Sequence, residues 1–357
     1  MNKRVKKCFI CCLVLSLFFT SFPQLLVYAE NTEQPVQSKV SEEVEYVTFV
    51  EDETNELGMS EEKVVSVEEI APYVILADGE TLPQIKTDEV SVLSDDVVQL
   101  DTEDALYQYL KEQVVARNSQ ITVSVPIEIN NKIGPVSAMT SAQEYTESCT
   151  GQEGDALKYG GVGYSVSTRS YTGATRVTYT YYMNYFSTAE QEKQLTSAVT
   201  CALASLNLNG KTDVEKVIAI HNYICDHVDY DYDYDGLSDS TNTVKYTAYG
   251  ALCNGTAVCN GYAVLFYRMC KDAGLSVRII PGTANGGAHA WNIVRVGNVY
   301  YNVDTTWDGQ DTQTFNRYLL KNENDFSADH TRRENCATEE FNDAYPMAEQ
   351  SYVLPAT

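Results

Sequence analysis

The spacing of apolar residues predicts helices and strands from residue 101 onwards. Residues 101–104 read Asp-Thr-Glu-Asp, which is typical of a helix N-terminus, and Leu106, Leu110 and Val114 then follow at helical spacing. Residues 121–125 alternate between apolar and polar as a strand does. Residues 176–186 are rich in tyrosine, valine and threonine, which also favours a strand. Residues 130–160 are polar and contain glycine, so we expect a loop there.

The same pattern predicts three helices and a hairpin in the second half. Capping-box patterns at residues 187–190 and 212–215 each precede a helical run of apolar residues. His221 lies on the apolar face of the second run, and we interpret it as a structural histidine. A third helix begins near Cys259 and ends at Gly274. Three strands follow, at residues 277–280, 290–296 and 299–304.

Residues 1–29 are typical of a secretory signal peptide. Four basic residues precede an apolar run over residues 9–22, and Val27-Tyr28-Ala29 offers a small-residue cleavage site. The apolar run is short for a membrane span. We therefore expect a secreted protein, extracellular or cell-wall associated, that has no membrane span after signal cleavage.

The next segment is acidic. Residues 30–100 hold 19 Asp and Glu but three Lys, a composition that predicts a largely disordered stalk, although residues 45–50 could form one strand. We divide the chain into the signal peptide, this stalk, the N-terminal part of the globular region, a catalytic core and a C-terminal tail. The last three of these segments are residues 101–175, 176–345 and 346–357.

Charge and cysteine content narrow the class of protein. The formal net charge of −25 argues against nucleic acid as a partner. Seven cysteines remain after the signal peptide, and an odd number leaves at least one thiol unpaired. We expect Cys201, Cys225 and Cys270 to be small buried hydrophobic residues. Residues 30–357 contain no CxxC pair, so the sequence does not support a zinc site.

Cys259 is placed where a thiol becomes a nucleophile. It begins an apolar helical run, and a helix N-terminus favours the thiolate form. Val296-Gly297-Asn298-Val299 predicts a two-residue hairpin turn. If Val296 pairs with Val299, His289 and Asp304 become diagonal neighbours on one face of the sheet. Asp304 would then orient the imidazole of His289, as in a thiol catalytic triad.

Three sequence blocks resemble the core of the bacterial transglutaminase-like superfamily. They are Gly250-Ala-Leu-Cys-Asn-Gly-Thr-Ala-Val-Cys259-Asn-Gly-Tyr-Ala263, His289-Ala-Trp-Asn292 and Tyr301-Asn-Val-Asp304-Thr-Thr-Trp-Asp308. The resemblance covers roughly residues 175–335, with Asp329-His330 in a later block. It implies an α+β fold, in which a papain-like core packs helices on an antiparallel sheet. The acidic composition of residues 30–100 predicts a largely disordered region before this core. It also implies a triad of Cys259, His289 and Asp304.

The resemblance implies acyl transfer through a thioester on a protein, peptide or cell-wall peptide. Peptidase or amidase activity is favoured over protein crosslinking, because nothing in the sequence marks an amine-acceptor site. The Cys259 N–H is one expected oxyanion donor, with Tyr249 and Asn254 as candidates for the second. Trp291 is expected beside the triad. Trp291, Tyr249 and Asn254 are the candidate substrate-binding residues. The alternative is a non-catalytic cell-wall or extracellular binding module on the same fold.

One segment partly matches a calcium-binding loop. Ser238 and Asn242 stand where such a loop usually has an apolar residue and a bidentate carboxylate, so we favour a solvated acidic loop. No other cofactor is expected. The candidate calcium ligands are Asp231, Asp233, Asp235 and Asp239.

Overall fold

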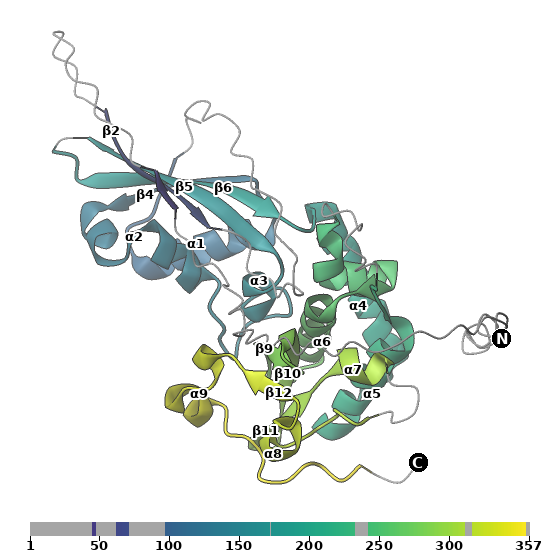
Figure 1. The fold of residues 1–357 in the computed structure, drawn as a ribbon. Coiled ribbons are helices and arrows are strands. Elements are labelled where there is room, and N and C mark those ends of the chain that lie inside the picture. Colours follow the sequence, from purple (N-terminus) through teal and green to yellow (C-terminus); the bar gives the residue numbers. More distant parts are fainter. Residues whose placement is uncertain are drawn as a thin grey trace, which may run out of the picture. The chain divides into compact units, whose positions relative to one another are not determined.

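The computed structural model describes residues 97–171, 173–232, 242–310 and 316–354, and the backbone of two earlier strands. Those strands are β1 (Glu45–Val47) and β2 (Glu62–Ile70). The described residues form two main sheets with helices (Figure 1). Their helices are all too short or too polar to cross a membrane.

The first sheet has six strands in the order β1-β2-β5-β6-β4-β3. β2 lies within the segment predicted to be a stalk, yet it pairs antiparallel with β5. The strand predicted at residues 176–186 is β6, which pairs with β4 and β5 in this sheet rather than with the strands of the second sheet. The remaining strands are β3 (Val98–Gln99), β4 (Gln120–Pro126), β5 (Val162–Tyr171) and β6 (Arg176–Tyr185).

Two helices cover one face of this sheet (Figure 1). α1 (Glu103–Val115) begins where the sequence predicts, with the Thr102 side chain accepting a hydrogen bond from the backbone of Ala105. The predicted apolar face is confirmed, since Leu106, Leu110 and Val114 are fully buried.

The loop predicted at residues 130–160 is wrong over much of its length. α2 (Ile127–Ala142) and the short α3 (Asp155–Lys158) occupy parts of it. α2 is broken at Gly134, where φ is +63°, and Pro135 follows. This break divides the helix into two short pieces. Because polar residues surround the break, neither piece shows a recognisable helical spacing of apolar residues.

The second half combines helices with a four-stranded sheet in the order β11-β10-β9-β12. Thr188 caps the first helix and Thr212 the second, each through a capping box. The second box is the predicted one, and the first lies one residue later than expected. The helices are α4 (Ala189–Ser205), α5 (Asp213–His227) and α6 (Cys259–Asp272). The strands are β9 (Val277–Ala284), β10 (Gly287–Val296), β11 (Val299–Val303) and β12 (His330–Arg332).

α6 is buried along nearly its whole length and packs on the second sheet. Every residue from Cys259 to Cys270 is buried. The Asn292 side chain of β10 donates to the carbonyl of Ala263 at 3.0 Å, which fixes the helix against the strand. Asn260, with no exposed surface, donates to the carbonyls of Tyr246 and Tyr159 at 2.7 and 2.9 Å. These bonds fix the position of the helix N-terminus.

The predicted hairpin register is confirmed. Val296 pairs with Val299, and the ladder continues to Asn292 opposite Val303. The chain then leaves the sheet, because α7 (Thr305–Gln310) begins immediately after Asp304. Asp304 therefore stands at a junction between a strand and a helix.

A buried ion pair connects α3 to the second sheet. The Arg278 guanidinium of β9 donates to both oxygens of Asp155 at 2.8 and 3.0 Å, and the backbone N–H of Ile279 donates to the same carboxylate at 2.9 Å. The Asp155 side chain is 1% exposed. The rings of Tyr145 and Tyr345 lie 4.2 and 4.6 Å from the guanidinium. The Arg278 side chain is 13% exposed, so removing the carboxylate would leave a largely buried cation without its partner.

We expect Asp155→Ala to lower the free energy of unfolding by about 3–5 kcal/mol, the usual cost of breaking a buried pair. The matched control is Asp101→Ala, because the Asp101 side chain is 75% exposed and pairs with Arg176 at 2.6 Å. An exposed pair of this kind contributes about 0–1 kcal/mol. Urea denaturation of both variants measures the difference, and equal losses would contradict the structural role of Asp155.

Candidate active site

Cys259 is the first residue of α6. The helix has no side-chain cap at its N-terminus. The partial positive charge of a helix N-terminus stabilises an anion there. Gly261 allows the helix to start close to the preceding loop, because a Cβ at this position would lie 2.8 Å from the Lys245 carbonyl oxygen. Cys259 itself is 6% exposed.

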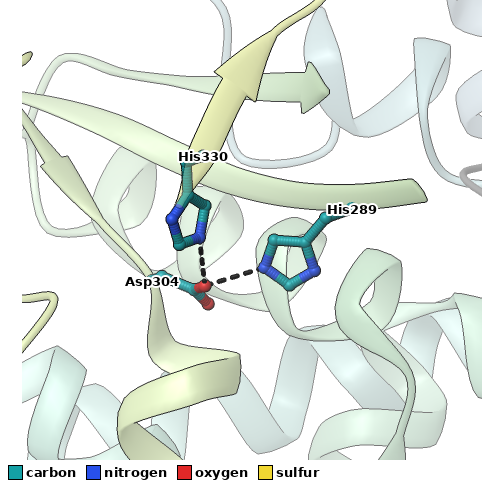
Figure 2. A group of neighbouring side chains, drawn as sticks. All are labelled: His289, Asp304 and His330. Carbon is teal, nitrogen blue, oxygen red and sulfur yellow. Dashed lines mark hydrogen bonds and ion pairs between the residues drawn. The ribbon is translucent and has the colours of Figure 1, made fainter. Parts of the chain in front are cut away.

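His289 and Asp304 meet as the register predicts. His289 Nε2 lies 2.7 Å from Asp304 Oδ2, and the two residues are 5% and 1% exposed (Figure 2). Since Nε2 faces the carboxylate, Nδ1 is left for the sulfur of Cys259. Burial by itself lowers the pKa of His289, but the charge and hydrogen bond of Asp304, followed by those of Cys259, raise it to about 10. The structure therefore brings all three predicted triad residues together.

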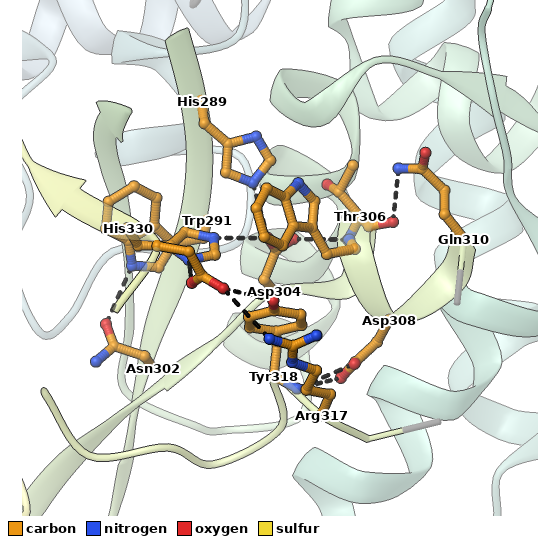
Figure 3. A network of polar contacts seen from close by, with 12 residues as sticks. His289, Trp291, Asn302, Asp304, Thr306, Asp308, Gln310, Arg317, Tyr318 and His330 are labelled. Carbon is orange, nitrogen blue, oxygen red and sulfur yellow. Dashed lines mark hydrogen bonds and ion pairs between the residues drawn. The ribbon is translucent and has the colours of Figure 1, made fainter. Parts of the chain in front are cut away.

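Asp304 is held by four donors. Its Oδ1 accepts from the backbone N–H groups of Thr306 and Trp307 at 2.8 and 3.2 Å, so this carboxylate caps α7. Its Oδ2 accepts from His289 and, at 3.1 Å, lies against Nε2 of a second histidine, His330 (Figures 2 and 3). Burial raises the pKa of Asp304, but the two histidines hold it below its usual range.

His330 is a site residue whose contact with Asp304 the sequence pattern does not predict. Its imidazole has no exposed surface. It belongs to β12, which pairs with β9 so that His330 lies opposite Ala284. The Asp329-His330 pair in the later sequence block was the available signal, but nothing local in the sequence connects it to Asp304.

A second buried cluster lies beside the first. His221 of α5 has no exposed surface, and its Nε2 lies 2.9 Å from Asp308 Oδ2 of α7 (Asp308 is labelled in Figure 3). The Cys225 sulfur lies 3.6 Å from the same nitrogen. The Tyr318 N–H donates to both oxygens of Asp308 at 3.0 and 3.1 Å. His221 is thus satisfied inside the fold, as predicted, and it fixes α7 against α5.

The other predicted site residues are Trp291, Tyr249 and Asn254. Trp291 lies beside His289 as expected, with the two ring centres 6.2 Å apart. It is 1% exposed and donates from Nε1 to Asn302 at 3.0 Å, so it offers a substrate almost no surface. The Tyr249 hydroxyl donates to Gln194 of α4 at 3.0 Å. Asn254 is exposed at the end of a short helix, Gly250–Asn254. The structure assigns neither Tyr249 nor Asn254 a contact with the triad.

The cysteines of the described residues are all free thiols. Cys270 is buried as predicted, but Cys201 is exposed and Cys225 is only partly buried. Cys201 lies on α4, on a part of that helix which faces solvent, so its prediction as a buried residue is wrong.

Two groups of residues bear on metal binding. Three of the candidate calcium ligands, Asp233, Asp235 and Asp239, lie outside the described residues. His289, Asp304 and His330 offer three ligand atoms within 4.8 Å of one another. Both nitrogen–oxygen distances in this trio, 2.7 and 3.1 Å, are those of hydrogen bonds. A metal there would displace the proton through which His289 is oriented, so the trio serves either a metal or the thiol.

Comparison with known proteins agrees with this geometry. Residues 203–305, which include Cys259, His289 and Asp304, match the sequence profile of the transglutaminase-like superfamily. The chain therefore carries a transglutaminase-like domain over residues 203–305.

Two relatives and one solved structure are similar to parts of the chain. The kyphoscoliosis peptidases of Homo sapiens and Mus musculus are each 32% identical over 126 residues, which cover 31% of this chain. The chain spans 19% of the length of these relatives. A crystal structure of a TGase aligns over 62% of this chain and 61% of its own, with 14% identity and a TM-score of 0.32.

The His289–Asp304 pair predicts how stability depends on pH. The folded-state pKa of His289, about 10, lies above the ordinary value of 6.5. Protonated His289 therefore stabilises the fold fully below pH 6.5, and this contribution is lost as the pH rises through about 10. We expect the free energy of unfolding to fall over this range by up to about 1.4 kcal/mol per pH unit.

Urea denaturation at a series of pH values between about 7 and 9 measures this slope. The comparison variant is Asp304→Asn, which keeps an oxygen to cap α7 but removes the charge that holds the proton on His289. Its slope should be shallower. The same slope in both proteins would show that His289 is not the group responsible.

Proposed function

We propose that this chain is a secreted thiol acyl-transfer enzyme that hydrolyses peptide or carboxamide bonds through a thioester. The observation that carries the proposal is the meeting of Cys259, at an uncapped helix N-terminus, with the paired side chains of His289 and Asp304. Export rests on the pattern of residues 1–29, which lie outside the described part of the chain.

Each group has a defined task in this reaction. The Cys259 thiolate attacks the carbonyl carbon, and the N–H at the start of α6 donates to the oxygen that becomes negative. His289 then gives its proton to the departing amine, and a thioester forms. Water attacks the thioester while His289 accepts its proton, and the thiolate leaves as the acid product is released. Asp304 keeps Nε2 of His289 protonated and directed away from the sulfur.

Hydrolysis is preferred to crosslinking for two reasons. Nothing in the sequence marks a second site for an amine, and the relatives with 32% identity are named as peptidases. The preference is open to a direct measurement, because both reactions share the thioester and differ only in what attacks it.

We expect Cys259→Ala to lower peptide hydrolysis by at least about 1,000-fold, because no other residue replaces the nucleophile. The test incubates the protein with a mixed peptide library, with and without a labelled primary amine, and follows free carboxylates and amine incorporation. Cys201→Ala, which removes an exposed thiol on α4, is the matched control and should retain full activity. Amine incorporation that exceeds hydrolysis would reassign the enzyme as a crosslinker. Equal activity in wild type and Cys259→Ala would support the non-catalytic binding module instead.

The thiols should also differ in reactivity. With iodoacetamide at neutral pH, Cys259 should be alkylated fastest of the seven described cysteines, although Cys201 and Cys253 are more exposed. Peptide mapping after short labelling times measures the order. Labelling that follows exposure alone, with Cys201 and Cys253 first, would contradict an activated thiol at Cys259.

A further inference from the structure

His330 faces a carboxylate on each side of its ring. Nε2 lies 3.1 Å from Asp304 Oδ2, and Nδ1 lies 2.7 Å from Asp329 Oδ1. A carboxylate accepts hydrogen bonds, so both contacts are satisfied only when both ring nitrogens carry a proton. A ring with two N–H groups is a cation.

The surroundings favour a fixed, dry cation. The imidazole has no exposed surface. Its ring centre lies 4.1 Å from that of Phe326 and 4.6 Å from that of Trp307. Aromatic faces attract a cation most strongly where water is excluded. Asp329 is itself held from behind by the Tyr318 hydroxyl at 2.7 Å.

The proposed function gives this cation a task. A general acid works best when its proton affinity matches the working pH, yet Asp304 makes His289 hold its proton tightly. A positive charge on His330, whose ring centre lies 5.4 Å from that of His289, offsets part of the charge of Asp304. His289 would then release its proton to the leaving amine more readily.

We propose that His330 is a positioning residue that donates hydrogen bonds to both Asp304 and Asp329 as an imidazolium, and that its charge tunes how readily His289 gives up a proton. The inference rests on the proposed function for its catalytic meaning, whereas the charge on His330 is a property of the folded chain alone. The titratable and charged groups that face this site are Cys259 of α6, His289 of β10, Asp304 and Asp308 at α7, His221 and Cys225 of α5, and Arg317, Tyr318 and Asp329 before β12.

The first test uses the unmodified protein and needs no substrate. The chain has four histidines, so NMR spectra of the ¹⁵N-histidine-labelled chain show each ring separately. At neutral pH both nitrogens of His330 should carry protons. A neutral His330, protonated on one nitrogen only, would overturn the proposal whether or not the chain is an enzyme.

The second test separates charge from shape. In Asp329→Asn the amide can donate to Nδ1, so His330 keeps its hydrogen bond to Asp304 but loses its charge. His330→Gln removes the ring. Both variants should raise the pH at which His289 titrates by roughly one unit, because a nearby cation is lost. If His330 acted through its shape alone, His330→Gln would instead let Asp304 move away from His289 and would lower that pH. Asp329→Asn would then leave the titration of His289 unchanged.

The control is Lys132→Gln, which removes an exposed cation paired with Glu103 on α1. The exposed His227, which stacks on Tyr223, reports any general change in the spectra. If hydrolysis is observed, kcat should fall about 10- to 100-fold in Asp329→Asn with KM nearly unchanged. If the titration shift occurs without any hydrolysis, the proposed function fails and the assignment of His330 stands. An unchanged or lowered titration of His289 in Asp329→Asn would overturn the assignment.

Discussion

The buried carboxylate of Asp304 is the group on which the geometry of the site depends. An ionised carboxylate with almost no exposed surface is costly unless donors satisfy it. Here one oxygen accepts from the first turn of α7 and the other lies against two imidazoles. The same group therefore ends β11, starts α7 and orients His289. A change in any of these elements would alter the direction in which the imidazole faces the sulfur.

Several parts of this arrangement follow from the sequence because they depend on neighbouring residues. Caps mark the starts of α1 and α5, and the turn at residues 297–298 fixes the register of β10 against β11. His289 and Asp304 lie on the two strands of one hairpin, with few residues between them. The two-residue alternation of side chains along a strand and the geometry of the turn are therefore enough to bring them together. The start of α6 is signalled in the same local way by the apolar run behind Cys259.

Other parts depend on contacts that no local pattern encodes. His330 reaches Asp304 only because β12 pairs with β9 at the far side of the sheet. α2 was missed because Gly134 and Pro135 interrupt its period, although Ala138, Met139 and Ala142 after the break are buried. The burial of Trp291 was not predictable either, since an indole beside a triad could equally face a substrate. These residues can be recognised in the sequence, but the tertiary contact that determines the role of each one cannot.

β9 explains why two histidines from separate strands can share one carboxylate. It lies between β10 and β12, with Gly282 opposite both His289 and Arg332. A Cβ at Gly282 would lie 2.5 Å from the Trp291 indole and 2.2 Å from the Thr331 carbonyl oxygen. Only glycine lets the indole cover the strand while β12 pairs closely behind it. The same strand carries Arg278, which Asp155 of α3 holds in place. The position of His330 against Asp304 thus depends on the absence of a side chain at Gly282. The strand that carries this glycine, β9, is held in place by an ion pair outside the site.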